Sequence, residues 1–290
     1  MFIDCLLDAL WDTLKLLPFL YLTYLLMEFL ERHASEKTEQ MIARSGKAGP
    51  FFGAVLGALP QCGFSAAGAG LYAGRVITTG TLLAVFWSTS DEMIPILISR
   101  GSDPGLILKI LGIKVAVAAL AGFLTDALCR LFRRPSSQHL HIEELCREEH
   151  CHCEGHSIWL SALIHTASIS LSIFLISLGL NLVLAAAGEN FFAGILSSRP
   201  IIGCMIAGLV GLIPNCAASV AITELYLSGI LTPGAMLAGL LTGAGVGLLV
   251  LFRSNRPLRD SFRLTAILLS VALLVGILFD ALSLGAWLGL

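Results

Sequence analysis

The sequence contains little charge. Charged residues make up 13% of its 290 residues, whereas hydrophobic residues make up 56%. A water-soluble protein of this size could not bury so many apolar side chains in its core. We therefore predict a polytopic membrane protein embedded in a lipid bilayer. The formal net charge of -2 leaves no basic surface to neutralise phosphates, which excludes nucleic acid as a partner.

Several motifs are also missing. The N-terminal segment has neither a basic region nor a small-residue cleavage site, so its first apolar run is expected to remain as a span. The absence of a Walker motif argues against direct use of ATP. The eight cysteines are spread over apolar segments and one polar loop, which is not the pattern of a disulfide framework. No nucleophile and base occur at catalytic spacing, so neither an enzyme nor a cofactor is predicted.

An internal repeat organises the chain. A proline, an amide, a cysteine and a serine occur in the same order in LPQCGFS and in IPNCAAS, and the two copies lie 154 residues apart, as Cys62 and Cys216 do. At the same offset Tyr72 falls on Tyr226, and Asp126 falls on Asp280. Matches at a single offset over this distance indicate a duplication, so the chain is predicted to consist of two related halves.

Each half is predicted to contain three apolar spans and one segment broken by proline. The spans are expected at 10–30, 77–99, 106–132, 158–186, 231–252 and 262–284, and the broken segments at 50–72 and 200–226. Each piece of a broken segment has only about 11 to 13 residues, too few to cross about 30 Å of hydrocarbon alone. A broken segment is therefore either one kinked span or a re-entrant hairpin.

The placement of lysine and arginine favours the hairpins. With hairpins, nearly all basic loop residues collect on one side, which is then cytoplasmic, and only Arg100 and Arg199 remain outside. Three crossings in each half would also invert the second half relative to the first. We therefore predict an all-α fold of two inverted repeats with ten helical segments: a first repeat (1–132), a cytoplasmic His/Cys-rich loop (133–156) and a second repeat (157–290), with both termini outside.

The tips of the two hairpins are a candidate ion site. Non-helical backbone is tolerated in a membrane only where protein or a water-filled cavity surrounds it. Amide, thiol and hydroxyl groups at such tips would offer a metal ion mixed soft and hard ligands. The candidate ligands are Gln61, Cys62, Ser65, Asn215, Cys216 and Ser219. In the alternative interpretation, the prolines kink helices while the cysteines and serines only pack or bond within their own helix.

Carboxylates inside the apolar segments are a second signal. Asp91 and Glu92 lie within an apolar run, where charges are costly and usually mark an ion or proton pathway. The matching place in the second half carries the glycine-rich TGAGVG instead. Glu224, in the second broken segment, is expected to face the same cavity. The alternative for the acidic pair is a salt bridge to Lys109 or Lys114 on the following span.

The polar loop is dense in metal ligands. Histidine and cysteine side chains there do not follow the spacing of a zinc finger, so one folded site is not expected. Imidazole and thiolate ligands suit Zn²⁺, Cu⁺, Ni²⁺ or Co²⁺, and such a tract would capture or sense ions for the pore. An ordinary solvated linker is the alternative. The ligands are His139, His141, Cys146, His150, Cys151, His152, Cys153 and His156.

These motifs resemble a known family. LPQCGFS, FWSTSDE, IPNCAASVAITELYLSG and GLLVLFRSNR are similar to segments of the ten-span heavy-metal or arsenic efflux family, whose members are also labelled manganese transporters. The resemblance implies export of a metal or metalloid from a prokaryotic cytoplasm across the plasma (inner) membrane. Ten spans equal six crossings and two hairpins of two pieces each.

The sequence leaves several functions open. The first is a secondary exporter of a divalent transition metal, with Mn²⁺ and Zn²⁺ leading, that works by alternating access with proton antiport. The second is efflux of arsenite or an organoarsenical bound by Cys62 and Cys216. A passive channel and a membrane enzyme are further alternatives. In each transport case the ion is a substrate and not a cofactor, and a homo-oligomer is compatible with the sequence.

Overall fold

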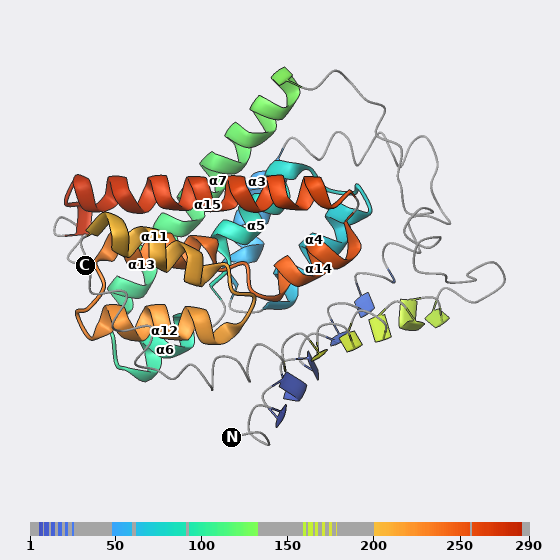
Figure 1. Ribbon diagram of the computed structural model, residues 1–290, viewed down its shortest axis with the longest axis horizontal. Coiled ribbons are helices and arrows are strands. Elements are labelled where there is room, and N and C mark those ends of the chain that lie inside the picture. The colour runs from blue at the N-terminus through green and yellow to red at the C-terminus, as the bar shows by residue number, and fades with distance from the viewer. Residues whose placement is uncertain are drawn as a thin grey trace.

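The computed structural model describes residues 48–59, 62–90, 93–132, 200–255 and 257–285, together with single helical positions between 6 and 25 and between 159 and 178. Within these residues the secondary structure is helical and no strand occurs. Figure 1 shows the helices gathered into one bundle. The predicted spans at 10–30 and 158–186 and the His/Cys-rich loop lie wholly or largely outside the described residues.

The helices of the two halves follow one another in the same order. In the first half they are α3 (Gly49–Gly57), α4 (Cys62–Ala73), α5 (Thr79–Ser88), α6 (Met93–Ser99) and α7 (Pro104–Phe132). In the second half they are α11 (Pro200–Gly211), α12 (Cys216–Leu227), α13 (Pro233–Thr242), α14 (Val246–Ser254) and α15 (Leu258–Ala281).

Four stretches of the described chain are long and apolar enough to cross a membrane. They are Thr79–Ser99, Pro104–Leu131, Pro233–Ser254 and Leu258–Ala281. The first and third are mostly enclosed, with 75% and 83% of their most apolar window buried, whereas the second and fourth have only 22% and 28% buried. Because apolar side chains are stable in contact with lipid, α7 and α15 suit the periphery of a membrane protein and the other two spans form its centre.

Both central spans are interrupted, although the sequence predicted continuous helices over 77–99 and 231–252. In the first, α5 ends at Ser88, Thr89 and Ser90 are not helical, and α6 begins at Met93. In the second, α13 ends at Thr242 and α14 begins at Val246. The hydroxyl groups of Ser88 and Thr89 both donate to the carbonyl oxygen of Val85, at 3.0 and 2.8 Å. Such local bonds compete with the helical ladder, and glycines weaken it at the second break.

A buried aspartate fixes the start of the first broken span. The carboxylate of Asp126, on α7, accepts hydrogen bonds from the hydroxyl of Thr78 and from the backbone N–H of Gly80, both at 2.7 Å. The first turn of a helix carries N–H groups without helical partners and a partial positive charge, and a carboxylate satisfies both. Asp126 therefore stabilises the N-terminus of α5 from a neighbouring helix.

The second half repeats this arrangement at the offset of 154 residues. The carboxylate of Asp280, on α15, accepts hydrogen bonds from the hydroxyl of Thr232 at 2.6 Å and from the backbone N–H of Gly234 at 2.8 Å. The sequence predicted that Asp126 and Asp280 correspond, and these bonds show that they make equivalent contacts.

Close helix contacts at glycine recur in the same way. A side chain at Gly80 would overlap the carbonyl oxygen of Gly122, and a side chain at Gly234 would overlap that of Gly276. The first pair joins α5 to α7 and the second joins α13 to α15. In each half the absence of a Cβ thus allows the inner span to approach the outer one at backbone distance.

The two halves are interlocked. Within each half, α3 packs on α5 and α7, and α11 packs on α13 and α15. In contrast, α4 packs mainly on α14, and α12 packs on α6 as well as on α11 and α13 of its own half, so one helix of each half also contacts the other half. Figure 1 shows α4 beside α14 on the right and α12 beside α6 at the lower left. This exchange places the breaks of both central spans between the halves.

Removing the shared aspartate should destabilise either half. We expect Asp126→Ala or Asp280→Ala to lower the apparent melting temperature of the purified protein, because the loss of two buried hydrogen bonds to a helix start costs about 1 to 3 kcal/mol. Asp126→Asn keeps the shape and one acceptor oxygen and should lose less. Thermal unfolding in detergent measures the effect; an Asp126→Ala protein as stable as the wild type would contradict it.

Candidate functional site

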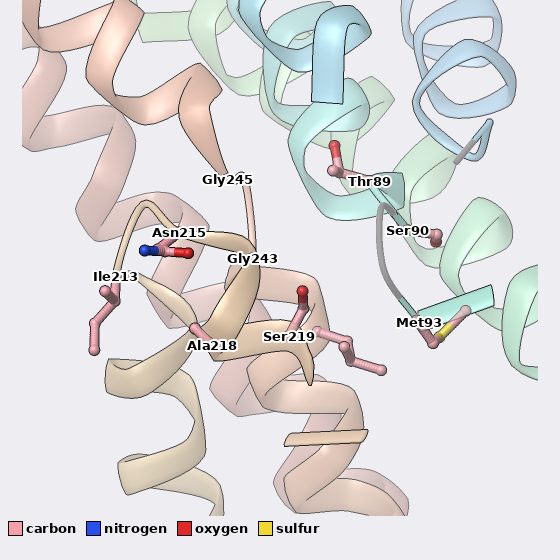
Figure 2. Close-up of a pocket in the computed structure, with 11 residues that line it drawn as sticks. Thr89, Ser90, Met93, Ile213, Asn215, Ala218, Ser219, Gly243 and Gly245 are labelled. Atoms are coloured by element: carbon pink, nitrogen blue, oxygen red, sulfur yellow. The ribbon is translucent and has the colours of Figure 1, made fainter. Parts of the chain in front are cut away.

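A small cavity lies where the breaks of the central spans meet the tip of the second broken segment. It has room for about one water molecule or one bare ion. Figure 2 shows residues from the first half on one side and residues from the second half on the other. The lining residues are Thr89, Ser90, Met93, Gly211, Ile213, Asn215, Ala218, Ser219, Leu240, Gly243 and Gly245.

Most of the polar side chains that line the cavity belong to residues at or next to helix ends. Asn215 stands immediately before α12 and is 8% exposed, and its carbonyl oxygen accepts the backbone N–H of Ala218 at 3.2 Å. Ser219 lies one turn further along α12. Across the cavity, Thr89 and Ser90 are 3% and 2% exposed. The lining residues thus carry an amide and three hydroxyls besides their backbone carbonyls, groups that are ligands for hard or borderline cations.

Helix ends of both polarities converge on this cavity. The C-terminal ends of α5, α11 and α13 and the N-terminal ends of α6, α12 and α14 lie at or next to lining residues. Free carbonyls give a C-terminus a partial negative charge, and free N–H groups give an N-terminus a partial positive charge. The C-terminal ends can bind a cation through their carbonyl oxygens, and the N-terminal ends can stabilise the negative charge of an acidic side chain.

The structure brings together only some of the predicted ligands. Asn215 and Ser219, both predicted ligands, line the cavity. Ser65, the counterpart of Ser219, is fully buried at the crossing of α4 and α14, where a Cβ on Gly247 would lie 2.8 Å from its Cβ and from its carbonyl oxygen. At the equivalent crossing the position of Gly247 is taken by Met93, which lines the cavity with Ser219. The two tips are therefore packed differently.

Glu224 does not line this cavity, in contrast to the prediction. Its carboxylate accepts two hydrogen bonds from the guanidinium of Arg100, from Nε at 3.0 Å and from Nη2 at 2.8 Å. Arg100 follows α6 directly and Glu224 lies in the last turn of α12, so the packing of these two helices brings the charges together at an exposed position. The pair joins the two halves, and its hydrogen bonds raise the pKa of Arg100 above the ordinary value.

Other predicted ligands lie outside the described residues. These are Gln61, Asp91, Glu92, the side chains of Cys62 and Cys216, and all eight His and Cys residues of the loop. In the sequence, Asp91 and Glu92 connect Ser90 to Met93, two residues that line the cavity, and the two cysteines begin α4 and α12. Within the part of the chain that the structure describes, no three His, Cys, Asp or Glu side chains gather closely enough to hold a metal ion.

Lys114 is the site residue to which sequence reasoning gave too small a role. It is fully buried in the middle of α7, and its Nζ donates to the backbone carbonyl oxygens of Thr89 and, at 3.1 Å, of Leu240. Both of these residues line the cavity. A lysine within an apolar run is itself a sign of a functional site. From the sequence, however, Lys114 was considered only as a salt-bridge partner for Asp91 or Glu92.

A second polar contact joins the halves at the other exchanged pair of helices. The carboxylate of Asp260, at the start of α15, accepts a hydrogen bond from the hydroxyl of Tyr72 at 2.8 Å. The guanidinium of Arg75 lies 3.6 Å from the same oxygen, and the amide of Asn255 donates to it at 3.4 Å. This network ties the end of α4 to the junction of α14 and α15.

Comparison with known proteins identifies the family of the chain. No curated protein and no solved structure matches the chain. Residues 1–188 match the family described as "Putative, 10TM heavy-metal exporter" (ArsP_2), and this match covers more than half of the chain. The apolar helices of the described residues agree with a multi-pass membrane protein. The chain therefore belongs to this family of ten-span heavy-metal exporters.

Proposed function

We propose that this protein exports a transition-metal cation of the Mn²⁺ or Zn²⁺ class from the cytoplasm by secondary transport. The observation that carries the proposal is the cavity between the halves, built from the breaks of two buried spans and lined by Asn215, Ser219, Thr89 and Ser90. Interrupted helices at the centre of a transporter commonly offer their free ends to the transported ion. Asp91 and Glu92, next to Ser90 in the chain, would supply the charge that a divalent cation requires.

The proposal includes a defined topology in a prokaryotic plasma membrane. Each broken segment would form a re-entrant hairpin, the second half would be inverted relative to the first, both termini would lie outside and the His/Cys-rich loop would be cytoplasmic. The exchange of α4 and α12 between the halves supports an internal two-fold relation, because each makes the equivalent contact on the opposite half. Accessibility labelling of single cysteines placed at Arg100 and Arg253 would test the orientation.

In alternating access, the two polar contacts between the halves would act as gates on the two sides of the cavity. The exposed pair of Arg100 and Glu224 closes the α6–α12 side, and the network around Asp260 closes the α4–α14 side. An exposed ion pair contributes little stability and can open readily, whereas a carboxylate held by three partners is harder to release. Metal export would be coupled to proton entry, and Asp91 and Glu92 would carry the proton.

A panel of metals tests this function. Cells that lack the protein and cells that express it should be loaded with Mn²⁺, Zn²⁺, Co²⁺, Ni²⁺, arsenite or an organoarsenical, and the retained element measured. We expect expression to lower retention of one or more of the divalent metals. If retention of every element in the panel is unchanged while the protein is present in the membrane, the proposed function is wrong.

Arsenical efflux is a second candidate because the paired cysteines begin two helices at corresponding positions, α4 and α12. Trivalent arsenic is a soft centre that thiolates bind well. In that case Cys62→Ser and Cys216→Ser would abolish resistance to the arsenical, whereas neutralising Asp91 would have little effect. Efflux of a divalent metal predicts the reverse order of effects.

The loop is proposed to collect ions for the cavity. Deletion of residues 139–156 should raise the metal concentration needed for half-maximal export without lowering the maximal rate, because the loop raises the local ion concentration and does not form the transport site. Export measured against metal concentration in inverted vesicles would show this. Complete loss of export by a correctly inserted deletion variant would give the loop a direct part in transport.

A further inference from the structure

The buried lysine occupies an unusual position between the two central spans. Lys114 is 0% exposed, and its Nζ bonds the carbonyl oxygen of Thr89, just beyond the end of α5, and that of Leu240, in the last turn of α13. One ammonium group thus joins a carbonyl of the first half to a carbonyl of the second. Both carbonyls belong to residues that line the cavity.

A charged group in such a position is unfavourable unless nearby groups compensate its charge. Moving an ammonium group out of water is unfavourable even after the protein relaxes around it, so a buried lysine needs strong compensation. Here the compensation includes the C-terminal ends of two helices, where unpaired carbonyls concentrate partial negative charge. In discontinuous transporter helices, the same kind of C-terminal carbonyl commonly coordinates a coupling cation.

The corresponding position of the second half carries no charge. At the offset of 154 residues, Lys114 corresponds to Leu268 on α15. There the carbonyl oxygen of Leu268 accepts the indole N–H of Trp87 at 3.1 Å, and its apolar side chain is fully buried. The same helix position therefore holds either an apolar side chain or an ammonium. The charged version lies where the ends of α5 and α13 meet beside the cavity.

We propose that the Lys114 ammonium is a built-in monovalent cation that holds the ends of α5 and α13 together, in the role that a bound Na⁺ would have in an ion-coupled transporter. The wild-type protein then requires no monovalent metal ion for stability or transport. A variant without the ammonium has a vacant cation site lined by the two carbonyls. The transport part of this inference depends on the proposed function, but the binding part does not.

The test measures binding by stability, independently of transport. Purified Lys114→Ala protein should melt below the wild type in a buffer of N-methyl-D-glucamine, a cation too large for the vacancy. Na⁺ or methylammonium at about 150 mM should raise its melting temperature by about 3 to 6 °C, because a ligand that binds only the folded state stabilises it. The wild type and Lys109→Ala, which removes an exposed lysine of the same helix, should not respond.

The outcomes separate this inference from simpler explanations. A Lys114→Ala protein that no small monovalent cation stabilises, or that fails to fold in every buffer, would overturn it. If Lys114 only neutralises a carboxylate, Asp91→Asn in the Lys114→Ala background would restore stability without any cation, and this result would also overturn it. A variant that folds in Na⁺ and unfolds on transfer to N-methyl-D-glucamine supports it, even if no metal is exported.

Discussion

Cells that express the Asp91→Asn variant should retain metal as if they had no transporter. Asp91 follows Ser90, which lines the cavity, and a divalent cation held among neutral amide, hydroxyl and carbonyl groups needs a nearby carboxylate. A tenfold loss of export corresponds to only about 1.4 kcal/mol, less than the usual cost of removing one partner from a buried pair of charges. We therefore expect export to fall by at least about tenfold.

The control for this substitution is a carboxylate away from the cavity. Asp103→Asn changes an exposed aspartate just before α7 and should export metal as the wild type does. Initial rates of metal uptake into inverted vesicles, normalised to inserted protein, would compare the two variants. If Asp91→Asn and Glu92→Gln both export at the wild-type rate, the acidic pair does not belong to the transport site. The proposed site would then lack the negative charge that a divalent cation requires.

The membrane class and the equivalence of positions in the two halves could be predicted from the sequence. Composition alone predicted a membrane protein, because a chain with so few charged residues does not have enough polar surface to face water on all sides. The offset of 154 residues predicted equivalent positions, and Asp126 and Asp280 show this directly by making the same two hydrogen bonds. Composition and a repeat at a fixed offset can both be read directly from one sequence, so no knowledge of tertiary contacts is needed to detect them.

The breaks in the central spans were not predicted. Hydropathy reports whether a stretch can lie in a membrane, but it does not show whether the helix continues through it. At Thr89 the interruption depends on hydroxyl bonds to the preceding turn and on the distant Lys114, which accommodates the freed carbonyl. The different packing of Ser65 and Ser219 also depends on the partner helix, with Gly247 opposite one and Met93 near the other. These are tertiary contacts that one sequence does not reveal.

Gly245→Ala should leave a protein that inserts in the membrane but exports little metal. Gly245 lines the cavity and precedes α14, with φ 53° and ψ −139°, a conformation that is open to glycine and strained for any residue with a Cβ. Holding an alanine there costs about 1 to 3 kcal/mol, and the backbone can avoid that cost by changing the break between α13 and α14. Because the break forms one wall of a cavity as small as one ion, a modest change of backbone would remove the ligand geometry.

Matched glycines separate loss of the site from general strain. Gly229→Ala also places an alanine at positive φ, 74°, but in open space beyond α12, and Gly112→Ala fills open space on α7. We expect both to retain most of the export activity, while Gly245→Ala loses at least about tenfold at an equal amount of inserted protein. Wild-type export by Gly245→Ala would show that the break at this glycine does not shape the transport site. An equal loss in Gly229→Ala would attribute the effect to backbone strain and not to the cavity.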